Sequence, residues 1–283
     1  MSKIVIMTDS TCDLSQELIE KNNIVVIPLF VNFSFAEYKD GVNITTPKLY
    51  ELVEEHNELP KTAAVSIAEF INMFEKHLTD DNEIIYMGIA QTMSRTYENA
   101  LMAAQEVNED RIHVINSANL STGIGLQLLK ACKYRDEGRP VPEIIKCLNK
   151  NSTLVRSQFA IEKMDYLHKG GRCSGVTKFV GTVLKIKPII VVREGKMDVG
   201  KKPIGKMKAA LDAMLKMAEA DKDNIDLDNI IITHSMADEA CQYLNEKAKE
   251  MFPEANIITT NAGCVISSHC GPGTIGILYM LKD

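Results

Sequence analysis

A histidine and a cysteine stand side by side near the end of the chain, as His269 and Cys270, and Gly271, Pro272 and Gly273 follow directly. Such a pair could supply a thiolate nucleophile and its general base, provided that the base reaches the thiol. Adjacent residues of an extended segment point to opposite faces, which places these two side chains poorly for acting on each other. We therefore expect Cys270 to pack in the interior, and His269 either to contact a ligand or to be a satisfied histidine in a turn.

Four polar turns follow or bound apolar strand-like runs. They contain Asp9, Ser10 and Thr11; Thr62; Thr92 to Thr96, with Ser94 among them; and Asn116 with Ser117, followed by Ser121. Each hydroxyl alone is more simply explained as a helix N-cap. Ligands of parallel α/β sheets nevertheless bind at the carboxyl ends of the strands, where helix N-termini attract anions. Four such turns together predict a site for a carboxylate or a phosphate, and the absence of GxxxxGK[ST] and GxGxxG patterns disfavours a nucleotide.

A short basic turn, Lys-Gly-Gly-Arg at residues 169–172, comes later in the chain. It is either a solvated loop, a basic edge beside a bound anion in which Arg172 takes part, or a docking patch. The seven cysteines are scattered without a CxxC pair or a spacing typical of metal ligands. We therefore expect no metal site, no other cofactor, and reduced thiols in a cytoplasmic protein.

The elements that must position these residues alternate between short apolar strands and segments of helical period, which is typical of βαβ units around a parallel sheet. In the first half, strands are expected over residues 3–8, 24–33, 83–90 and 112–117, and helices over 15–23, 46–57, 66–78, 94–107 and 121–138. In the second half we expect a strand at 155–162, a hairpin over 187–204, a helix over 205–220, and further strands at 229–235, 256–260 and 274–281 around a helix at 236–252.

These patterns predict an α/β protein of two domains. The first, residues 1–155, is expected to be a three-layer parallel-sheet domain that carries the anion-binding turns. The second, residues 156–283, is expected to be a mixed-sheet α/β domain. No Gly/Ser-rich linker marks the boundary, so the two domains should pack closely.

Composition narrows the class of partner. Hydrophobic residues make up 45% of the 283 positions and charged residues 25%, which is typical of a globular protein rather than a disordered chain. The net charge of -6 offers no basic footprint for nucleic acid. The most apolar long stretch, residues 176–192, is interrupted by lysines and by Pro188, so we expect no membrane span.

The chain resembles the DegV family, a group of bacterial fatty-acid-binding proteins, from end to end. The similarity rests on TDSTCDLS at 8–15, MSRTYENA at 93–100, VINSANLSTGIG at 114–125, YLHKGGRCSG at 166–175, LKIKPII at 184–190 and HCGPGTIGI at 269–277. Each motif alone is weak, and their order along one chain makes the resemblance specific.

That resemblance implies a non-enzymatic carrier with a long-chain fatty acid buried between its two domains. It implies that Thr62 and Ser94 hold the carboxylate and that His269 lies near it. Some members hand the fatty acid to a separate ATP-dependent kinase subunit, which makes the acyl-phosphate. The sequence departs from the family pattern where Val65 replaces a proline and Arg95 a glycine. The Arg95 guanidinium is expected either to hold the carboxylate more firmly or to point to solvent.

Two other functions compete with this one. The domain type also resembles dihydroxyacetone kinases, in which a histidine engages a small ketone, and His269 or His234 would take that role in a phosphotransfer enzyme. A basic face for a partner is expected at Arg172, Lys201, Lys202, Lys206 and Lys208. Our leading hypothesis is the fatty-acid carrier, with Ser10, Thr62, Ser94, Arg95, Arg172 and His269 as its ligand-binding residues.

Overall fold

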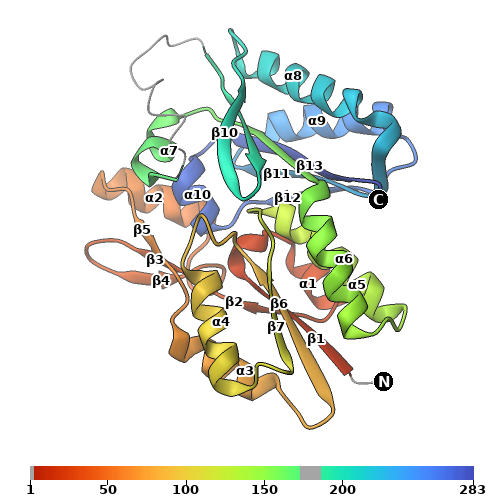
Figure 1. Cartoon of the computed structure of the whole chain (residues 1–283). Helices are drawn as coiled ribbons and strands as arrows, with labels where there is room; N and C mark the ends of the chain where they lie inside the picture. Colours follow the sequence, from red (N-terminus) through yellow and green to blue (C-terminus); the bar gives the residue numbers. More distant parts are fainter. Residues whose placement is uncertain (1–2, 173–185) are drawn as a thin grey trace.

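A computed structural model describes residues 3–172 and 186–283, and its strands form three sheets (Figure 1). The first sheet has four strands in the order β2-β1-β6-β7, and all of its pairings are parallel. Its strands are β1 (Lys3–Asp9), β2 (Ile24–Ile27), β6 (Asn82–Gly88) and β7 (Ile112–Asn116). Because the strands are parallel, the polar turns that follow them gather along one edge.

Helices cover both faces of this sheet, because alternate residues of each strand face opposite sides. Ile6 and Ile85 pack in one apolar cluster with α1 (Gln16–Lys21), α5 (Thr122–Asp136) and α6 (Val141–Leu154). Met7 and Ile84 pack in another with α2 (Thr46–His56), α3 (Ile67–His77) and α4 (Thr96–Val107). The three-layer arrangement expected for the first half is therefore present.

A small antiparallel sheet in the order β4-β3-β5 extends beside the first (Figure 1). Its strands are β3 (Phe30–Asn32), β4 (Glu37–Lys39) and β5 (Lys61–Ala63). The prediction of one strand over residues 24–33 was wrong, since β2 ends at Ile27 and β3 begins in a different sheet. Pro28 lies at the break and has no N–H to give to a ladder, and the N–H of Leu29 donates to the Ser10 hydroxyl at 3.1 Å.

The second half of the chain forms a six-stranded sheet in the order β10-β9-β8-β13-β11-β12. Only the β11–β12 pairing is parallel, so the sheet is mixed. Its strands are β8 (Val155–Ala160), β9 (Ile189–Arg193), β10 (Lys196–Lys201), β11 (Ile225–Ser235), β12 (Ile257–Asn261) and β13 (Thr274–Leu281). The expected hairpin is the antiparallel β9–β10 pair. The predicted α/β fold with a parallel and a mixed sheet is confirmed.

Two long helices, α8 (Met207–Ala220) and α9 (Asp238–Met251), cover the outer face of the mixed sheet (Figure 1). The remaining elements within residues 3–172 and 186–283 are short. They are η1 (Ser10–Cys12), α7 (Met164–Gly170), η3 (Lys222–Asn224) and α10 (Cys264–Cys270). The extended conformation expected around His269 and Cys270 was wrong, because both residues end α10. Successive residues of a helix still diverge by about 100°, so the two side chains point in different directions.

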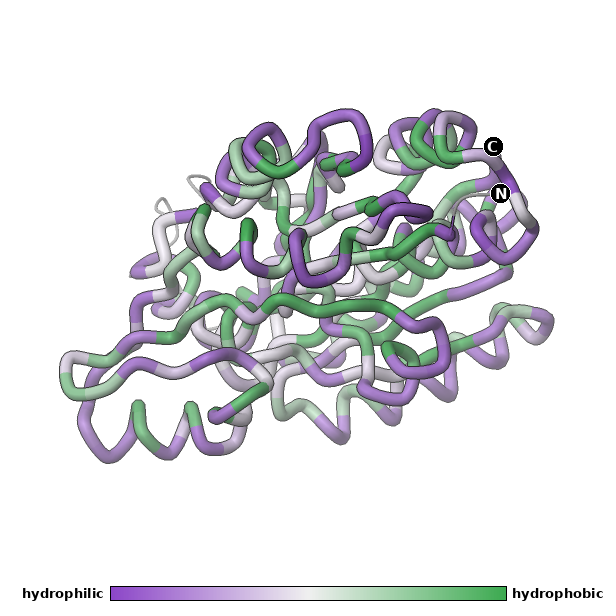
Figure 2. Tube along the Cα trace, turned by 90° about the horizontal axis from the view of Figure 1, so that it is seen from below, coloured by the Kyte–Doolittle hydropathy of each residue, from purple (hydrophilic) through white to green (hydrophobic). Residues whose placement is uncertain are grey.

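The inner face of the mixed sheet turns toward the parallel sheet. One apolar cluster contains Ile6 and Ile85 of the parallel sheet together with Phe159 and Ile190 of the mixed sheet. Figure 2 shows hydrophobic strands through the middle of the molecule and outer helices that alternate between polar and apolar residues. A shared cluster fits the expected close packing, and the domain boundary between residues 155 and 156 stays a prediction.

Within residues 3–172 and 186–283, no helix is both long and apolar enough to cross a membrane. Residues 176–185 of the apolar stretch singled out in the sequence lie outside the described residues, as does the CSG end of the 166–175 motif.

Candidate functional site

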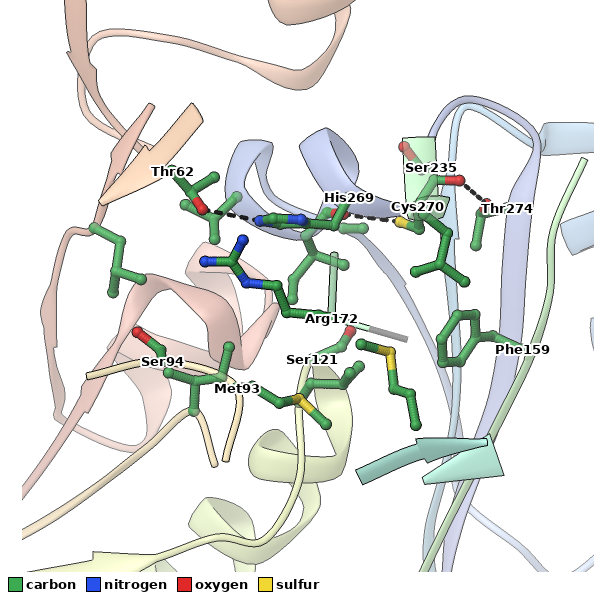
Figure 3. Close-up of a pocket in the computed structure, with 18 of the residues that line it drawn as sticks. Thr62, Met93, Ser94, Ser121, Phe159, Arg172, Ser235, His269, Cys270 and Thr274 are labelled. Carbon is green, nitrogen blue, oxygen red and sulfur yellow. Dashed lines mark hydrogen bonds between the residues drawn. The ribbon is translucent and has the colours of Figure 1, made fainter. Parts of the chain in front are cut away.

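A cavity of about 260 Å³ lies between the two larger sheets. Its lining combines β5, the turn between β6 and α4, the segment before α5, the inner face of the mixed sheet and α10. The polar residues Asp9, Ser10, Thr11, Asn116 and Ser117 are not part of it. Most of the lining is apolar. In Figure 3, Thr62, His269, Arg172 and Ser94 gather on one side of the cavity, and Phe159 stands on the opposite side. We call these two sides the polar end and the apolar wall.

Thr62 and His269 form the centre of the polar end. Thr62 lies in β5 and its Oγ1 is 2.8 Å from His269 Nε2 in α10, although 207 positions separate the residues in sequence. Burial, and then the nearby Arg172, lower the pKa of His269 to about 4. The imidazole is therefore neutral at physiological pH and carries one ring proton.

The position of that proton decides what Thr62 can offer. His269 Nδ1 is buried without a hydrogen-bond partner among the described residues, and it faces Gly170, where an added Cβ would lie 2.5 Å from it. Orphaned buried N–H groups are rarer than orphaned acceptors, which favours an unprotonated Nδ1. Nε2 then donates to the Thr62 hydroxyl, and the Thr62 O–H is left to donate to an anion in the cavity.

Ser94 stands in the turn before α4 and lines the cavity. Its Oγ accepts the N–H of Thr96 at 3.2 Å and lies 2.8 Å from Thr96 Oγ1. The helix opens two residues later than expected, with Arg95 as its N-cap, and the Ser94 hydroxyl binds the first N–H of α4 from the position before that cap while it also borders the cavity. A hydrogen bond of 2.7 Å from Asn99 to the Val65 carbonyl ties α4 to the segment that follows Thr62. This contact joins the two hydroxyl-bearing turns.

The two arginines differ in their surroundings. Both line the cavity. The Arg95 side chain is 84% exposed and its Nε lies 3.7 Å from Glu98, so it points to solvent rather than across the polar end. Arg172 is also exposed and donates to the Gly170 carbonyl at 2.7 Å, and Figure 3 draws its guanidinium between His269 and Ser94. Arg172 is therefore the cation that faces the polar end most directly.

Ser10 is not part of the cavity lining. Its hydroxyl accepts the Leu29 N–H and also hydrogen-bonds the carboxylate of Asp40. The turn after β1 has a structural role, because its polar groups hydrogen-bond neighbouring backbone and side chains.

Cys270 and His234 are engaged in structural contacts. The Cys270 thiol donates to the Ile266 carbonyl at 2.9 Å, and burial raises its pKa to about 12, so it is no thiolate at neutral pH. His234 belongs to the cavity lining, but its Nδ1 accepts the N–H of Ala237 at 3.1 Å. It follows Thr233 in β11 and shares the face of Ile232, which packs toward the outer helices.

The apolar wall was missed by the sequence reasoning. It consists of Phe159 of β8, Met197 of β10, and Gly276 with Leu278 of β13. Gly276 stands inside a strand, where a Cβ would lie 3.1 Å from Phe159 Cβ and 3.2 Å from Leu278 Cδ1. A glycine inside a strand marks close approach of backbone or ligand, and this was the one signal available in the sequence.

The tip of the β9–β10 hairpin connects the wall to the polar end. Thr92 donates from its hydroxyl to the carbonyl of Gly195, in the turn between the two strands. An added Cβ at Gly195 would lie 2.8 Å from Thr92 Oγ1, and φ there is +75°. Glycine is therefore required for the hairpin to reach the turn that carries Met93 and Ser94.

Comparison with known proteins shows similarity along the whole chain. The model of a family described as "Uncharacterised protein, DegV family" matches residues 3–282. A DegV domain-containing protein of Clostridium acetobutylicum is 34% identical over 285 residues, covering 100% of both chains. Another, from Caldanaerobacter subterraneus, is 32% identical over 285 residues, again covering 100% of both.

Solved structures are similar to the same extent. A DegV family protein from Thermus thermophilus, described by its fatty acid binding, superposes with a TM-score of 0.93 at 28% identity and covers 99% of this chain and 100% of that one. DegV from Bacillus subtilis, described as a fatty acid binding protein, has a TM-score of 0.87 at 27% identity, with 100% of both chains covered. A stearic acid-binding protein from Eubacterium ventriosum has a TM-score of 0.87 at 25% identity, covering 100% of this chain and 99% of that one.

Proposed function

Because this chain belongs to the DegV family, we propose that it binds a long-chain fatty acid in the cavity between the two larger sheets. The carboxylate lies at the polar end, where the hydroxyls of Thr62 and Ser94 donate to it beside His269 and Arg172. The hydrocarbon chain lies against Phe159 and the rest of the apolar wall. The observation that carries the proposal is the cavity itself, which has hydroxyl donors at one end and apolar side chains over most of its surface.

The sizes of the two free-energy contributions support these different roles for the hydrocarbon chain and the carboxylate. Each buried CH₂ contributes roughly 0.8 kcal/mol, so a dozen contribute about 10 kcal/mol before the costs of binding. A hydrogen bond to a charged carboxylate contributes about 1.5–3 kcal/mol. The hydrocarbon chain supplies most of the affinity, and the polar end fixes the orientation of the ligand.

We propose a carrier without catalysis of its own. The thiol beside His269 is protonated and hydrogen-bonded to the helix backbone, which leaves it no role as a nucleophile. No observation on the described residues favours the small-ketone phosphotransfer alternative, since His234 is held by backbone. The proposed setting is cytoplasmic, consistent with the six free cysteines of the described chain.

The proposed partner is a separate fatty-acid kinase subunit that receives the carboxylate. Arg172 is exposed at the polar end, and Lys201, Lys202, Lys206 and Lys208 are exposed elsewhere on the same half of the chain. If these residues dock a partner, association should slow as salt rises. Charge reversal at Lys201 and Lys202 that left acyl-phosphate formation unchanged would argue against the lysine part of this surface.

Native mass spectrometry of the protein purified from bacteria tests the carrier proposal. A bound species of fatty-acid mass is expected. A ligand-free protein that also ignores added palmitate and oleate would refute fatty-acid binding.

Ser94→Ala then separates headgroup binding from helix capping. Loss of the hydrogen bond to the carboxylate should weaken affinity by about 1.5–3 kcal/mol, roughly ten- to a hundredfold. Loss of the cap alone should cost about 1 kcal/mol of stability and leave affinity unchanged. Melting temperature and affinity measured on the same variant distinguish the two, and wild-type affinity with a lowered melting temperature would remove Ser94 from the site.

A further inference from the structure

The helix that carries His269 is held from outside its own sheet. By sequence, α10 connects β12 and β13 of the mixed sheet, yet Figure 1 shows it beside α2 and α7 between the two halves of the molecule. Besides Ser235 of β11, whose Oγ lies 2.8 Å from Ser267 Oγ, its anchors include residues from the first 62 positions. The Thr46 hydroxyl donates to the Ala262 carbonyl at 2.8 Å, and Tyr50 and Thr62 contact the helix further along. Two carboxylates also bind N–H groups at its first turn.

Asp40 binds two N–H groups at the start of α10. Its Oδ1 accepts the N–H of Cys264 at 2.7 Å, and its Oδ2 accepts the N–H of Val265 at 3.3 Å. The side chain is buried, and it reaches α10 across 224 positions of sequence. These two N–H groups have no partner within the helix, so Asp40 satisfies donors that would otherwise be orphaned.

Asp13 binds the N–H that precedes them. Its Oδ1 accepts the N–H of Gly263 at 2.8 Å, and its Oδ2 accepts the hydroxyl of Ser121 at 2.5 Å. Ser121 is the N-cap of α5 and lines the cavity. One buried carboxylate therefore joins the starts of two helices that border the ligand site.

Gly263 allows both carboxylates to approach at once. A Cβ on this residue would lie 3.1 Å from Asp40 Oδ2 and 3.2 Å from Asp13 Oδ1. That separation is closer than ordinary van der Waals contact, so any larger residue would push against both oxygens. The three residues form a fitted junction, which we call the α10 clamp: Asp13, Asp40 and Gly263.

Binding the N-terminus of a helix with two buried carboxylates costs free energy. Burial disfavours their charged forms and raises the pKa of both, and the nearby charge of Asp40 raises the pKa of Asp13 further. A helix N-terminus stabilises negative charge, which offsets part of this cost. A serine or threonine cap would serve a helix end without burying charge, so the clamp needs a reason beyond helix stability.

The clamp fixes where His269 stands. His269 is five residues after Cys264 in a seven-residue helix, so rotation or sliding of the first turn moves the imidazole directly. Its Nε2 must stay 2.8 Å from Thr62 for the Thr62 hydroxyl to keep its orientation. Hydrogen bonds tolerate only a few tenths of an ångström before they weaken.

We infer that Asp13 and Asp40 are positioning residues for the carboxylate site, acting through α10 on the contact between His269 and Thr62. This inference rests on the proposed fatty-acid binding. It states that the clamp controls recognition of the carboxylate and leaves recognition of the hydrocarbon chain unchanged.

Comparison of palmitate with hexadecanol, which has the same chain length and no carboxylate, tests the inference. The affinity of each ligand is measured for the wild type and for Asp13→Asn and Asp40→Asn. Both substitutions keep an oxygen acceptor but replace the second with an NH₂ that cannot accept. We expect palmitate affinity to fall about tenfold in each variant, and hexadecanol affinity to stay within twofold. An equal fall for both ligands, or no fall for palmitate, would overturn the inference.

Gly263→Ala provides a second route if the carboxylate variants fold poorly. It keeps both carboxylates and displaces them by a single methyl group, so a smaller loss of palmitate affinity, about threefold, is expected with hexadecanol unchanged. Unchanged palmitate affinity in Gly263→Ala would also contradict the inference. Asp221→Asn is the matched control: Asp221 accepts from Tyr279 at 2.7 Å, far from α10, and its loss should leave the ratio of the two affinities at the wild-type value.

The outcome also separates this inference from the proposed function. A wild-type protein that binds neither palmitate nor hexadecanol refutes fatty-acid binding itself. A wild type that prefers palmitate, with variants that keep the same preference, refutes only the role of the clamp.

Discussion

The polar end and the apolar wall of the cavity are built in opposite ways. Each group at the polar end comes from a different element: Thr62 from β5, Ser94 from the turn before α4, and His269 from α10. The wall comes from strands β8, β10 and β13 of a single sheet. Recognition of the carboxylate therefore depends on how separate elements dock, whereas the shape of the wall depends on the register of one sheet.

The largest effect on stability is expected from a substitution in the apolar wall. Phe159 is 8% exposed and packs in the cluster that joins the two larger sheets. Phe159→Ala should lower the free energy of unfolding by about 3–5 kcal/mol, since buried Phe to Ala substitutions lose both transfer free energy and packing. Urea unfolding measures this change. Phe159→Leu keeps most of the buried volume and serves as its control; a loss below 1 kcal/mol for the alanine variant would mean that the wall is not part of the shared core.

Acid should lower the stability of the protein through His269 at the polar end, because the residues of the apolar wall do not titrate. The pKa of His269 is about 4 in the folded protein, below its ordinary value of 6.5, so the unfolded chain binds a proton more readily than the folded one between these values. Stability should therefore fall as pH drops from 6.5 toward 4, by up to about 3 kcal/mol at about 1.4 kcal/mol per pKa unit.

Urea unfolding of the wild type and of His269→Gln at pH 5 and pH 7 measures how much of the loss of stability is due to His269. Glutamine does not titrate, so the variant should lose less stability on acidification. Parallel losses in both proteins would show that other groups carry the pH dependence.

A smaller and more selective effect is expected from Thr62→Val. The substitution keeps the shape of the side chain and removes the hydroxyl that His269 orients. Palmitate affinity should fall by about 1.5–3 kcal/mol, or roughly ten- to a hundredfold, measured by titration calorimetry. Hexadecanol binding provides the contrast, because the wall is intact. Wild-type palmitate affinity in this variant would remove Thr62 from the headgroup site.

Arg95→Ala should have the smallest effect. The Arg95 side chain is 84% exposed and pairs with Glu98 in the first turn of α4, where an exposed ion pair contributes little. We expect palmitate affinity to change less than twofold and the melting temperature to stay near the wild-type value. A tenfold loss of affinity would show that this arginine turns inward and contacts the carboxylate when the ligand is bound.

The same contrast explains what could be predicted from the sequence. Hydroxyl-bearing turns that bound apolar runs included Thr62 and Ser94, and the family resemblance singled out these two for the carboxylate. Ser94 follows β6 of the parallel sheet, whereas Thr62 lies in β5 of the small antiparallel sheet. The pattern could not distinguish them from Ser10, whose hydroxyl is taken by the Leu29 N–H. That bond exists only because the chain leaves the sheet at Pro28, a break hidden within a continuous apolar run.

The wall and the clamp had weaker signals. Phe159 and Leu278 read as ordinary strand residues, and nothing local shows which face of a strand borders a cavity rather than a helix. Nothing in the sequence around Asp13 and Asp40 indicates their contacts with α10, because the N–H groups that they bind there are more than 200 positions away. Motif order identified the family, but contacts between distant segments had to come from the structure.

The distance between the clamp's two sides has a consequence for how the chain folds. Asp13 accepts the N–H of a residue that lies 250 positions later in the chain, and Asp40 that of a residue 224 positions later. Contacts of such separation form slowly, because a long loop must close before they repay its entropy. During synthesis, the first half can build its parallel sheet early, yet its two buried carboxylates stay without their helix until residues 264–270 have been made. Truncation before residue 263 should therefore change the structure around residues 13 and 40, because it removes the N–H groups that Asp13 and Asp40 bind.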